Sequence, residues 1–353
     1  MSADSRQPPD VFAPILVLLE KDAAAHFRTT AVRLTPCSYE ERPFSHVMRV
    51  EVGRGSDAPS HLFVKVFKSK TPPGVDVVRQ VIVRDYETTR RVYDWMSVHP
   101  DLGAVPPVAC YPEHLAMVTE EVRGRTLLEY LHRHASWLAP QRHRDEVDAT
   151  MATVGRWLRA FQGIDSSGTR VTVDGLRDYI DVRLRRLVDE AAADFSEDDR
   201  QRVLRHIQVL GRHVASDDLV EVAVHADMAL GNLLVSDRRI VVLDFTMAKR
   251  GSALFDLTRL FVQMDLLAVK PYIRGSVIQR LQRAMVSGYD PALTLEHPLF
   301  RLHLLLHRIN HLTTLSVNRA PLLEELYNGT VRRRHRQWLA AQFERGEAPP
   351  PNA

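Results

Sequence analysis

The chain has 353 residues, and a single hydrophobic core seldom keeps growing beyond about 250–300 residues, so two packed lobes are expected. Its composition, 45% hydrophobic and 26% charged, is typical of ordered soluble proteins and excludes a chain that is disordered throughout. The 47 Lys and Arg residues nearly balance 44 Asp and Glu residues, so charge predicts no nucleic-acid partner.

The two cysteines and the N-terminal residues bear on location. Cys37 and Cys110 are too few and too far apart for a disulfide framework or a zinc site. Thiols without partners favour a reducing, cytoplasmic location. Residues 1–10 lack the basic start and apolar run of a secretory signal, and the apolar run at 12–19 is too short to span a membrane. We therefore expect no transmembrane segment.

The first third of the chain is rich in strands. Alternating apolar residues and turn residues separate its segments, and residues 36–45 form a polar, turn-like stretch. The pattern predicts helices at 11–27 and 75–97, and strands at 29–35, 46–52, 61–68, 107–110 and 115–122.

After Gly124 the apolar pattern is mainly helical. It is interrupted by two apolar runs, at 233–235 and 240–245, which a turn at 236–238 joins into a predicted hairpin. This order predicts an α+β fold with two lobes. The predicted helices are at 126–135, 141–164, 174–193, 196–214, 255–265, 271–287, 298–315 and 321–345.

The stretch around the predicted hairpin has the residues that phosphoryl transfer needs. Asp227 is followed five residues later by Asn232, and the hairpin returns the chain to Asp244 at a strand end. Phosphoryl transfer needs one carboxylate beside the attacking hydroxyl and oxygen ligands for Mg²⁺. Asp227 suits the first task, and Asn232 and Asp244 suit the second. The simplest alternative is an ordinary loop in which Asp227 and Asn232 only shape the turn.

Lys65 is the candidate for binding the nucleotide phosphates. It lies in the middle of a predicted strand between Val64 and Val66, where an ammonium group needs an anionic partner. Phosphate oxygens and a carboxylate of the following helix would both serve. Glu87 is our choice for that carboxylate, and Asp85 is the competitor. The alternatives are an edge-strand lysine that reaches solvent and a Glu87 on a solvated helix face.

Together these motifs resemble the aminoglycoside phosphotransferase/choline kinase superfamily, over about residues 29–260 and most closely at 222–260. The resemblance implies a protein-kinase-like fold with a small antiparallel-sheet N-lobe and a larger, mainly helical C-lobe. The domains expected are an N-terminal helical extension at 1–28, a nucleotide-binding N-lobe at 29–121, a catalytic and acceptor-binding C-lobe at 122–345, and a disordered tail at 346–353.

The resemblance also implies roles for residues and cofactors. Asp227 would be the catalytic base, and His225 would brace the catalytic loop. ATP and Mg²⁺ would be the cofactors, with Asn232 and Asp244 as the metal ligands. Asp256 belongs to a segment similar to the family's G-x-x-x-x-D-L motif, and we expect it to cap a helix and to be structural.

Two further segments resemble nucleotide-binding parts of the family. The stretch from Ser38 to Ser45 would cover the phosphates, although no glycine lies between Cys37 and Met48; a plain hairpin loop is the alternative. Residues 119–124 resemble the hinge whose backbone binds adenine. The phosphate candidates are Ser38, Arg42 and Ser45; the adenine candidates are Glu120, Val122 and Met117, the last of which is otherwise a core residue.

The departures from the protein-kinase pattern concern the acceptor. Ala229 occupies the position of a lysine in protein Ser/Thr kinases, and Phe245-Thr246 follows Asp244 without the usual glycine. They favour a small-molecule or glycan hydroxyl over a protein acceptor. The alternatives are an antibiotic kinase of the aminoglycoside type, an atypical protein kinase, and a non-catalytic nucleotide-binding scaffold. The acceptor and the oligomeric state do not follow from the sequence.

Two C-terminal features stay open. His303, His307 and His311 recur every four residues and share one helix face, which suits a polar solvent face, a metal site or the lining of an acceptor pocket. The basic run at 332–336 favours a solvated helix, and peripheral contact with an anionic membrane is the weaker alternative.

Overall fold

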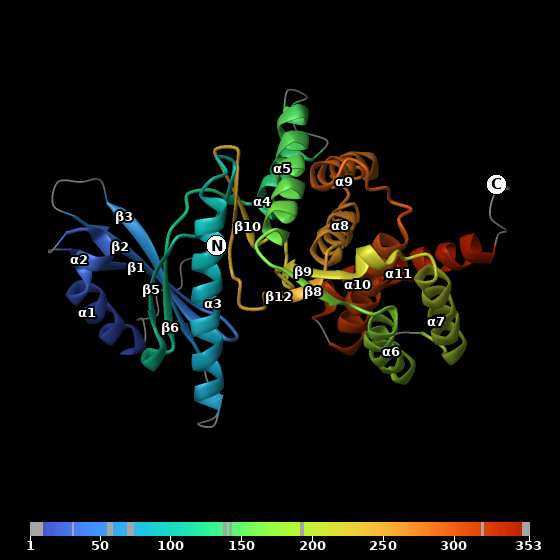
Figure 1. The fold of residues 1–353 in the computed structure, drawn as a ribbon, viewed down its shortest axis with the longest axis horizontal. Coiled ribbons are helices and arrows are strands. Elements are labelled where there is room, and N and C mark those ends of the chain that lie inside the picture. Colours follow the sequence, from blue (N-terminus) through green and yellow to red (C-terminus); the bar gives the residue numbers. More distant parts are fainter. Residues whose placement is uncertain are drawn as a thin grey trace. The chain divides into compact units, whose positions relative to one another are not determined.

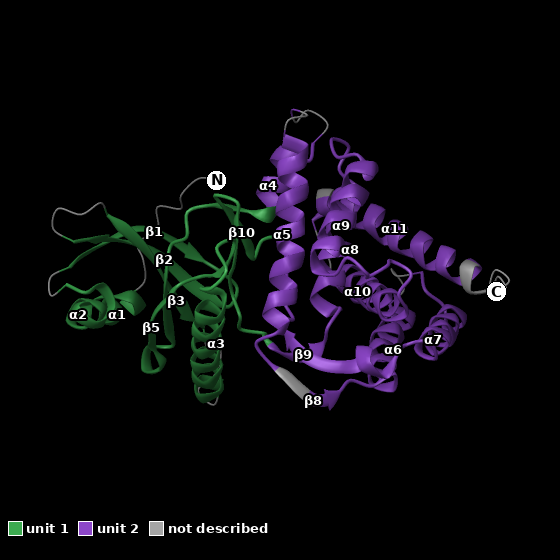
Figure 2. Cartoon of the chain, turned by 45° about the horizontal axis from the view of Figure 1, so that its top comes forward, with its two compact units in different colours: residues 1–127, 231–248 green, residues 128–230, 249–353 purple. Residues whose placement is uncertain are grey.

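The computed structural model of the protein describes residues 10–29, 32–54, 59–68, 74–136, 140, 143–190, 194–318 and 321–347. Most of the tail predicted at 346–353 lies outside the described residues, as does the start of the extension predicted at 1–28. The chain forms two compact units, residues 1–127 with 231–248 (unit 1) and residues 128–230 with 249–353 (unit 2) (Figure 2). The lobe boundary at residues 121 and 122 stays a prediction.

Unit 1 is built on a five-stranded antiparallel sheet with the order β1-β2-β3-β6-β5 (Figure 1). Alternate residues of β2 and β3, such as Val50 and Val64, are fully buried and form one core with Ile15 and Leu19 of the N-terminal helices. The other residues of these strands face the opposite side. The strands are β1 (Arg33–Glu41), β2 (Ser45–Gly53), β3 (Ser60–Phe67), β5 (Pro107–Tyr111) and β6 (Ala116–Glu120); the helices are η1 (Asp10–Phe12), α1 (Ala13–Lys21), α2 (Ala23–Phe27), α3 (Gly74–Met96) and η2 (Pro112–His114).

The polar stretch expected as a turn at 36–45 is mostly strand. β1 continues to Glu41, and only residues 42–44 turn, closed by a 2.8 Å hydrogen bond from Arg42 N to Ser45 O. The expectation failed because β1 is an edge strand. An edge strand tolerates exposed polar residues. It also accommodates a proline such as Pro36, which lies beside a β-bulge between Pro36 and Ser38.

The predicted hairpin is confirmed. β10 (Leu233–Ser236) pairs antiparallel with β11 (Arg239–Val242), and the two turn residues between them, Asp237 and Arg238, both have positive φ, as tight hairpin turns require. The hairpin is the centre of a second sheet in unit 1, with β4 (Leu102–Ala104) beside β11 and β7 (Arg125–Thr126) beside β10. The sequence analysis did not predict β4 or β7, which are too short for a periodic pattern.

Unit 2 is mainly helical, with one small sheet of order β12-β9-β8. Its closest helix pair is α5 with α9, where two glycines allow the backbones to meet. A Cβ atom at Gly155 would lie 2.1 Å from Met285 O, and one at Gly288 would lie 2.1 Å from Ala152 O. The elements are α4 (Leu127–His134), α5 (Arg144–Gln162), β8 (Ser166–Arg170), α6 (Val173–Asp189), α7 (Glu197–Gly211), η5 (Ser216–Leu219), β9 (Val220–Val224), β12 (Lys249–Ser252), α8 (Phe255–Leu267), α9 (Gly275–Tyr289), α10 (Pro298–Val317) and α11 (Leu322–Glu347).

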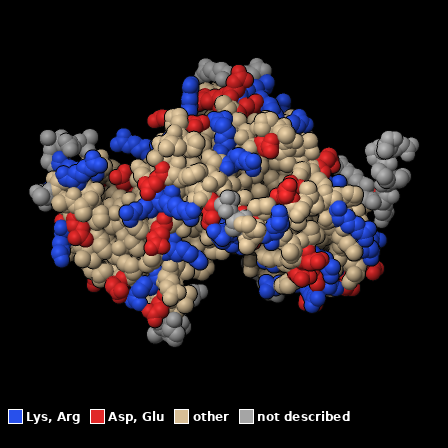
Figure 3. All heavy atoms as spheres, in the orientation of Figure 1, with Lys and Arg blue, Asp and Glu red and all other residues tan. Residues whose placement is uncertain are grey.

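The surface charge and the apolar character of the helices bear on possible nucleic-acid and membrane partners. On the face drawn in Figure 3, Lys and Arg side chains are interspersed with Asp and Glu rather than gathered in one field. None of the helices in the described ranges combines the length and the apolar character needed to span a bilayer. In the basic run of α11, Arg332, Arg334 and Arg336 form ion pairs with carboxylates of unit 2. These ion pairs neutralise positive charge that would otherwise attract an anionic membrane.

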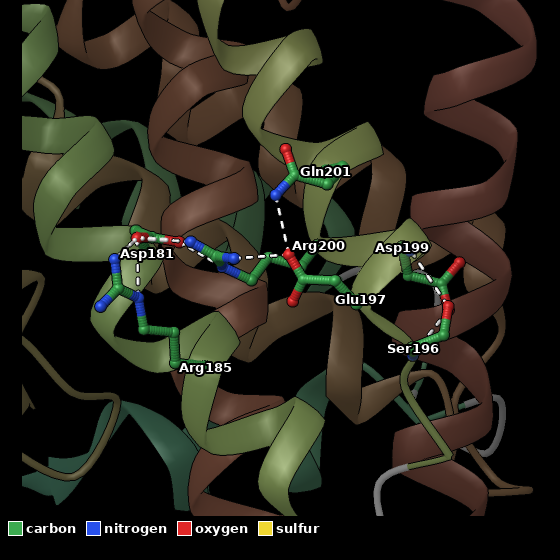
Figure 4. A network of polar contacts seen from close by, with 7 residues as sticks. All are labelled: Asp181, Arg185, Ser196, Glu197, Asp199, Arg200 and Gln201. Carbon is green, nitrogen blue, oxygen red and sulfur yellow. Dashed lines mark hydrogen bonds and ion pairs between the residues drawn. The ribbon is translucent and has the colours of Figure 1, made fainter.

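A polar network joins α6 to α7 (Figure 4). Arg200 donates two hydrogen bonds to Asp181, of 2.6 and 2.9 Å, and Arg185 also contacts this carboxylate. The hydrogen bonds from Arg200 lower the pKa of Asp181. At the start of α7, Ser196 and Asp199 form a capping box. The network therefore holds α6 against the first turns of α7.

We expect Asp181→Asn to lower the free energy of unfolding by about 1–3 kcal/mol, because it removes charge-assisted hydrogen bonds from a mostly buried pair. Urea denaturation at neutral pH would measure the change. Asp189→Asn is the matched control, since Asp189 is an exposed carboxylate at the end of the same helix. An equal change in both variants would contradict a specific role for the network.

Candidate functional site

A cavity of about 400 Å³ lies within unit 1. Apolar side chains of several strands form much of its wall, including Val47, Phe63 and Leu234. This size and lining are typical of a site for a small organic ligand. Seven residues predicted from the sequence for nucleotide or metal binding line the cavity: Arg42, Lys65, Met117, Glu120, Val122, Asn232 and Asp244.

Strand alternation explains why Lys65 reaches this cavity. Its neighbours Val64 and Val66 are buried in the core on the other side of the sheet. Lys65 therefore points the opposite way, in a row with its cross-strand partners Val47 and Met117. The ammonium group lies 3.2 Å from Asp244 Oδ2. Two residues predicted from distant parts of the sequence are thus an ion pair.

Asp244 is held in an uncommon backbone conformation. It lies two residues after the end of the hairpin strand β11, and its φ is +61°, a value that costs a non-glycine residue on the order of 1 kcal/mol. The hydroxyl oxygen of Thr246 lies 2.6 Å from Asp244 Oδ1 and 2.7 Å from Asp85 Oδ2. Its single proton can serve one carboxylate at a time. Such strain, kept by surrounding contacts, is common at functional sites.

The carboxylate of α3 that lines the cavity is Asp85, and the choice of Glu87 was wrong. Asp85 is 3% exposed, whereas Glu87 is exposed and is not among the lining residues. The reason is helix phase. The buried residues of α3 are spaced by three or four, and Glu87 lies about 200° around the helix from Asp85. The sequence pattern did not show which face would pack.

The three candidates for phosphate contact differ in their position relative to the cavity. Arg42, in the turn between β1 and β2, lines the cavity. Ser38 is exposed on the edge strand, Ser45 is buried at the start of β2, and neither is among the lining residues. At the predicted hinge, the Glu120 N–H already donates to Pro106 O. The Glu121 N–H likewise donates to His61 O, so these two N–H groups are occupied within the chain.

The predicted catalytic loop, residues 225–230, lies in unit 2 and follows β9. Asp256, which is 1% exposed, accepts hydrogen bonds from His225 N at 2.6 Å and Ala226 N at 3.0 Å. Burial raises the pKa of Asp256, and these donors oppose the shift. Ala226 has a φ of +62°, which is unfavourable for a non-glycine residue, so the hydrogen bonds to Asp256 stabilise a strained turn. The expectation that Asp256 caps a helix was wrong, because α8 begins after Leu254 without a side-chain cap.

Two residues that the sequence analysis missed also hold this loop. Arg259 lies 2.5 Å from Asp227 Oδ1 and donates to Ala226 O. The Gln263 amide donates to Met228 O and accepts from Leu230 N. With Asp256 they occupy positions i, i+3 and i+7 of α8, and therefore one helix face. Polar residues at this spacing on one face of the helix were the signal available in the sequence.

The three histidines of α10 are not on a solvent face. His303 is fully buried, with Nε2 2.7 Å from Ser252 Oγ, and His307 Nε2 donates to Phe255 O at 2.8 Å. The expectation of a polar solvent face was wrong because α10 is buried on nearly all sides, including the side that carries the histidines. Within the described ranges, the group of three possible metal ligands found does not include these histidines. Their place beside an acceptor stays a prediction.

These buried histidines predict an acid-sensitive fold. Burial lowers the pKa of His303 to about 4 and that of His307 to about 3, below the unfolded value of about 6.5. The unfolded chain therefore binds more protons between these values. The free energy of unfolding keeps the full contribution of these histidines above about pH 6.5. It falls as the pH decreases toward 4, by up to about 1.4 kcal/mol per pH unit for each histidine.

Urea midpoints between pH 7.5 and 4.5 would measure this slope. We expect His307→Gln to reduce it, because glutamine keeps a donor for Phe255 O and cannot titrate. His213→Gln, at an exposed position just after α7, is the control. A His307→Gln slope equal to that of the unsubstituted protein would contradict the assignment.

The comparisons with known proteins agree with this geometry. Residues 70–287 match the model of the phosphotransferase enzyme family, APH. The chain belongs to this family. The resemblance predicted from the sequence is thus confirmed, while among curated proteins no match is found. The structure of this APH-family protein is also similar to solved structures.

One is the streptomycin–ATP–APH(2″)-IIa ternary complex, at 13% identity and a TM-score of 0.53, covering 93% of this chain and 97% of that one. A second is a thermostable mutant of aminoglycoside phosphotransferase APH(4)-Ia with ADP and hygromycin B, at 15% identity and 0.54, covering 94% and 99%. A third is choline kinase from Cryptosporidium parvum Iowa II, at 12% and 0.54, covering 95% and 97%. The predicted α+β, two-lobed, protein-kinase-like fold is confirmed.

Proposed function

We propose that the protein transfers the γ-phosphate of ATP to a hydroxyl group of a small molecule or sugar. The observation that supports this most is the Lys65–Asp244 ion pair in a cavity that Asn232 also lines. A cation for phosphate and two oxygen ligands for a metal are the parts that phosphoryl transfer needs on the donor side. Membership of the phosphotransferase family supports the same chemistry.

The unit 1 cavity is the proposed nucleotide site. Met117 and the apolar wall pack against adenine, and the hinge residues Glu120 and Val122 bind its edge through backbone groups. Lys65 binds phosphate oxygens and Asp85 lies beside it, in the role first given to Glu87. Arg42 is the cation of the β1–β2 turn that reaches the phosphates; Ser38 and Ser45 have no such support.

Asn232 and Asp244 are the proposed ligands of Mg²⁺. Their amide and carboxylate oxygens are the hard donors that this ion prefers, and both line the same cavity, so the residues fit the ion. When bound, Mg²⁺ neutralises charge on the phosphate oxygens. The Thr246 hydroxyl can donate to either Asp244 or Asp85, and so orients one of the two carboxylates at a time.

Asp227 is the proposed base, and His225 and Asp256 keep its loop in shape. The Asp227 side chain is 46% exposed, so an acceptor hydroxyl can reach it. Arg259 provides a cation beside Asp227, where protein kinases have a lysine at the position of Ala229. We assign to Arg259 the orientation of the Asp227 carboxylate.

A small-molecule acceptor is favoured over a protein. The similar structures include an aminoglycoside phosphotransferase and a choline kinase, which supports a small acceptor, whereas a glycan acceptor rests on the sequence pattern alone. An aminoglycoside-type activity needs an acidic acceptor pocket, but α9 and α10 are rich in His, Arg and Gln. A cytoplasmic location fits the two free cysteines, Cys37 and Cys110.

The test is ATP consumption by the purified protein with Mg²⁺ and a panel of sugars, nucleosides, amino alcohols and antibiotics. We expect turnover with one class of hydroxyl acceptor and transfer of labelled γ-phosphate to it. Clear ATP binding without turnover on any acceptor would favour the non-catalytic scaffold. Transfer to a protein substrate at a higher kcat/KM than to any small molecule would favour an atypical protein kinase.

A further inference from the structure

A second cavity, of about 590 Å³, lies within unit 2 between helices α8, α9, α10 and α11. Its size is typical of a site for a small organic molecule. The lining is unusually rich in guanidinium groups. It contains Arg283, Arg301, Arg308 and Arg334, the carboxylates Asp265 and Glu296, the glutamines Gln279, Gln282, Gln337 and Gln342, and the ring of Trp338.

This cavity is separate from the catalytic loop in the same unit. On α8, the side chains that bind the loop are Asp256, Arg259 and Gln263. The residues of α8 that line the cavity are Phe261 and Asp265, about 200° around the helix from Arg259 and Gln263. One helix therefore presents the loop on one face and the cavity on the opposite face.

The charges around the cavity do not balance. Arg308 and Arg334 share the single carboxylate of Asp265, at 2.7 and 2.9 Å. Arg301 has one loose ion pair among the described residues, at 3.7 Å from Glu296, whose side chain is 73% exposed, and it donates a 3.1 Å hydrogen bond to the neutral Gln342 Oε1. Arg283 has no ion pair among the described residues. Four guanidinium groups thus face two carboxylates, an excess of two positive charges.

Part of this excess positive charge, that of Arg308, is buried away from water. Arg308 is 2% exposed, its guanidinium lies 4.5 Å from the centre of the Trp338 ring, and its Nε atom has no hydrogen-bond partner within the described chain. Burial lowers the pKa of Arg308, while Asp265 opposes the shift. A buried cation is costly unless an anion compensates it. Asp265 supplies one negative charge to two arginines, so a bound anion would stabilise the cluster further.

We propose that this cavity binds a small organic anion through a phosphate or carboxylate group. Guanidinium groups match both oxyanions in a forked geometry, and Arg283 and Arg301 have donors that are least committed to carboxylates of the chain. The glutamines of the wall supply donors and acceptors for the polar remainder of the ligand. The site is a regulatory or accessory one and does not rest on the proposed function, because the catalytic loop is on the other face of α8.

Calorimetric titration of the full chain with pyrophosphate and with citrate, at constant ionic strength, tests the proposal. We expect saturable binding of one of them, and the preferred anion tells phosphate from carboxylate recognition. Arg283→Gln and the double variant Arg283→Gln/Arg301→Gln should weaken it, the latter about tenfold or more. Arg333→Gln, an exposed arginine of α11 outside the lining, should bind as the unsubstituted protein does.

Two controls keep the outcome unambiguous. Lys65→Ala should leave the binding unchanged, since Lys65 belongs to the cavity of unit 1. Ligand-induced change in tryptophan fluorescence should be lost in Trp338→Phe, since Trp338 lines the unit 2 cavity. Circular dichroism would show that the variants fold. The proposal is overturned by the absence of saturable binding of both anions, by equal affinity in Arg283→Gln/Arg301→Gln, or by loss of binding in Lys65→Ala alone.

Discussion

Asp227→Asn is expected to lower kcat by about 10²–10⁴-fold, the range typical of losing a general base, with ATP affinity nearly unchanged. Asparagine keeps the shape of the side chain, and its amide oxygen still accepts the hydrogen bond from Arg259. It cannot accept the proton of an acceptor hydroxyl. The loop itself should persist, because Asp256 and Gln263 hold its backbone rather than the Asp227 side chain.

The measurement is steady-state transfer to the acceptor identified in the panel, together with calorimetric ATP binding. Asp217→Asn is the control, since Asp217 is an almost fully exposed carboxylate of the same unit with one distant ion pair. Full turnover in Asp227→Asn would remove Asp227 from the proposed role. Loss of ATP binding in the same variant would instead place Asp227 in nucleotide binding.

Asp244→Asn is expected to lower the transfer rate by more than about 10²-fold and to raise the Mg²⁺ concentration needed for half-maximal activity. The substitution removes a hard anionic ligand and leaves Lys65 without the carboxylate that lies 3.2 Å away. The backbone conformation should survive, since asparagine tolerates positive φ about as well as aspartate. The fold is therefore expected to stay intact while activity is lost.

Initial rates at a series of Mg²⁺ concentrations, with saturating ATP, would test this. Asp237→Asn is the matched control, because Asp237 is an exposed aspartate with positive φ in the turn of the same hairpin. We expect it to have normal rates and normal Mg²⁺ dependence. An unchanged Mg²⁺ dependence in Asp244→Asn would show that another residue holds the ion.

Local patterns predicted much of unit 1. Lys65, in the middle of a predicted strand, was expected to need an anionic partner, and the structure places it in the cavity, 3.2 Å from Asp244 Oδ2. The hairpin was predicted by two apolar runs and a short turn, and it is present, with Asp237 and Arg238 between its two strands. Both features depend on neighbours in the chain, which a single sequence displays.

Helix faces were predicted less well. A helix pattern shows that residues share a face but not which element covers that face. This explains why Glu87 was chosen over Asp85, although Asp85 is the buried residue of α3. It also explains why a solvent face was among the alternatives for the histidines of α10, although His303 and His307 pack against Ser252 and Phe255.

The sequence alone determined the family, the fold class and the motif from His225 to Asp244, because these depend on residue order and spacing over short distances. Only the tertiary structure showed that α8 braces the catalytic loop through Asp256, Arg259 and Gln263, and that four arginines surround a second cavity. These groups come from segments that packing brings together. Hydrogen bonds and ion pairs over such separations depend on a packed core, which no local pattern encodes.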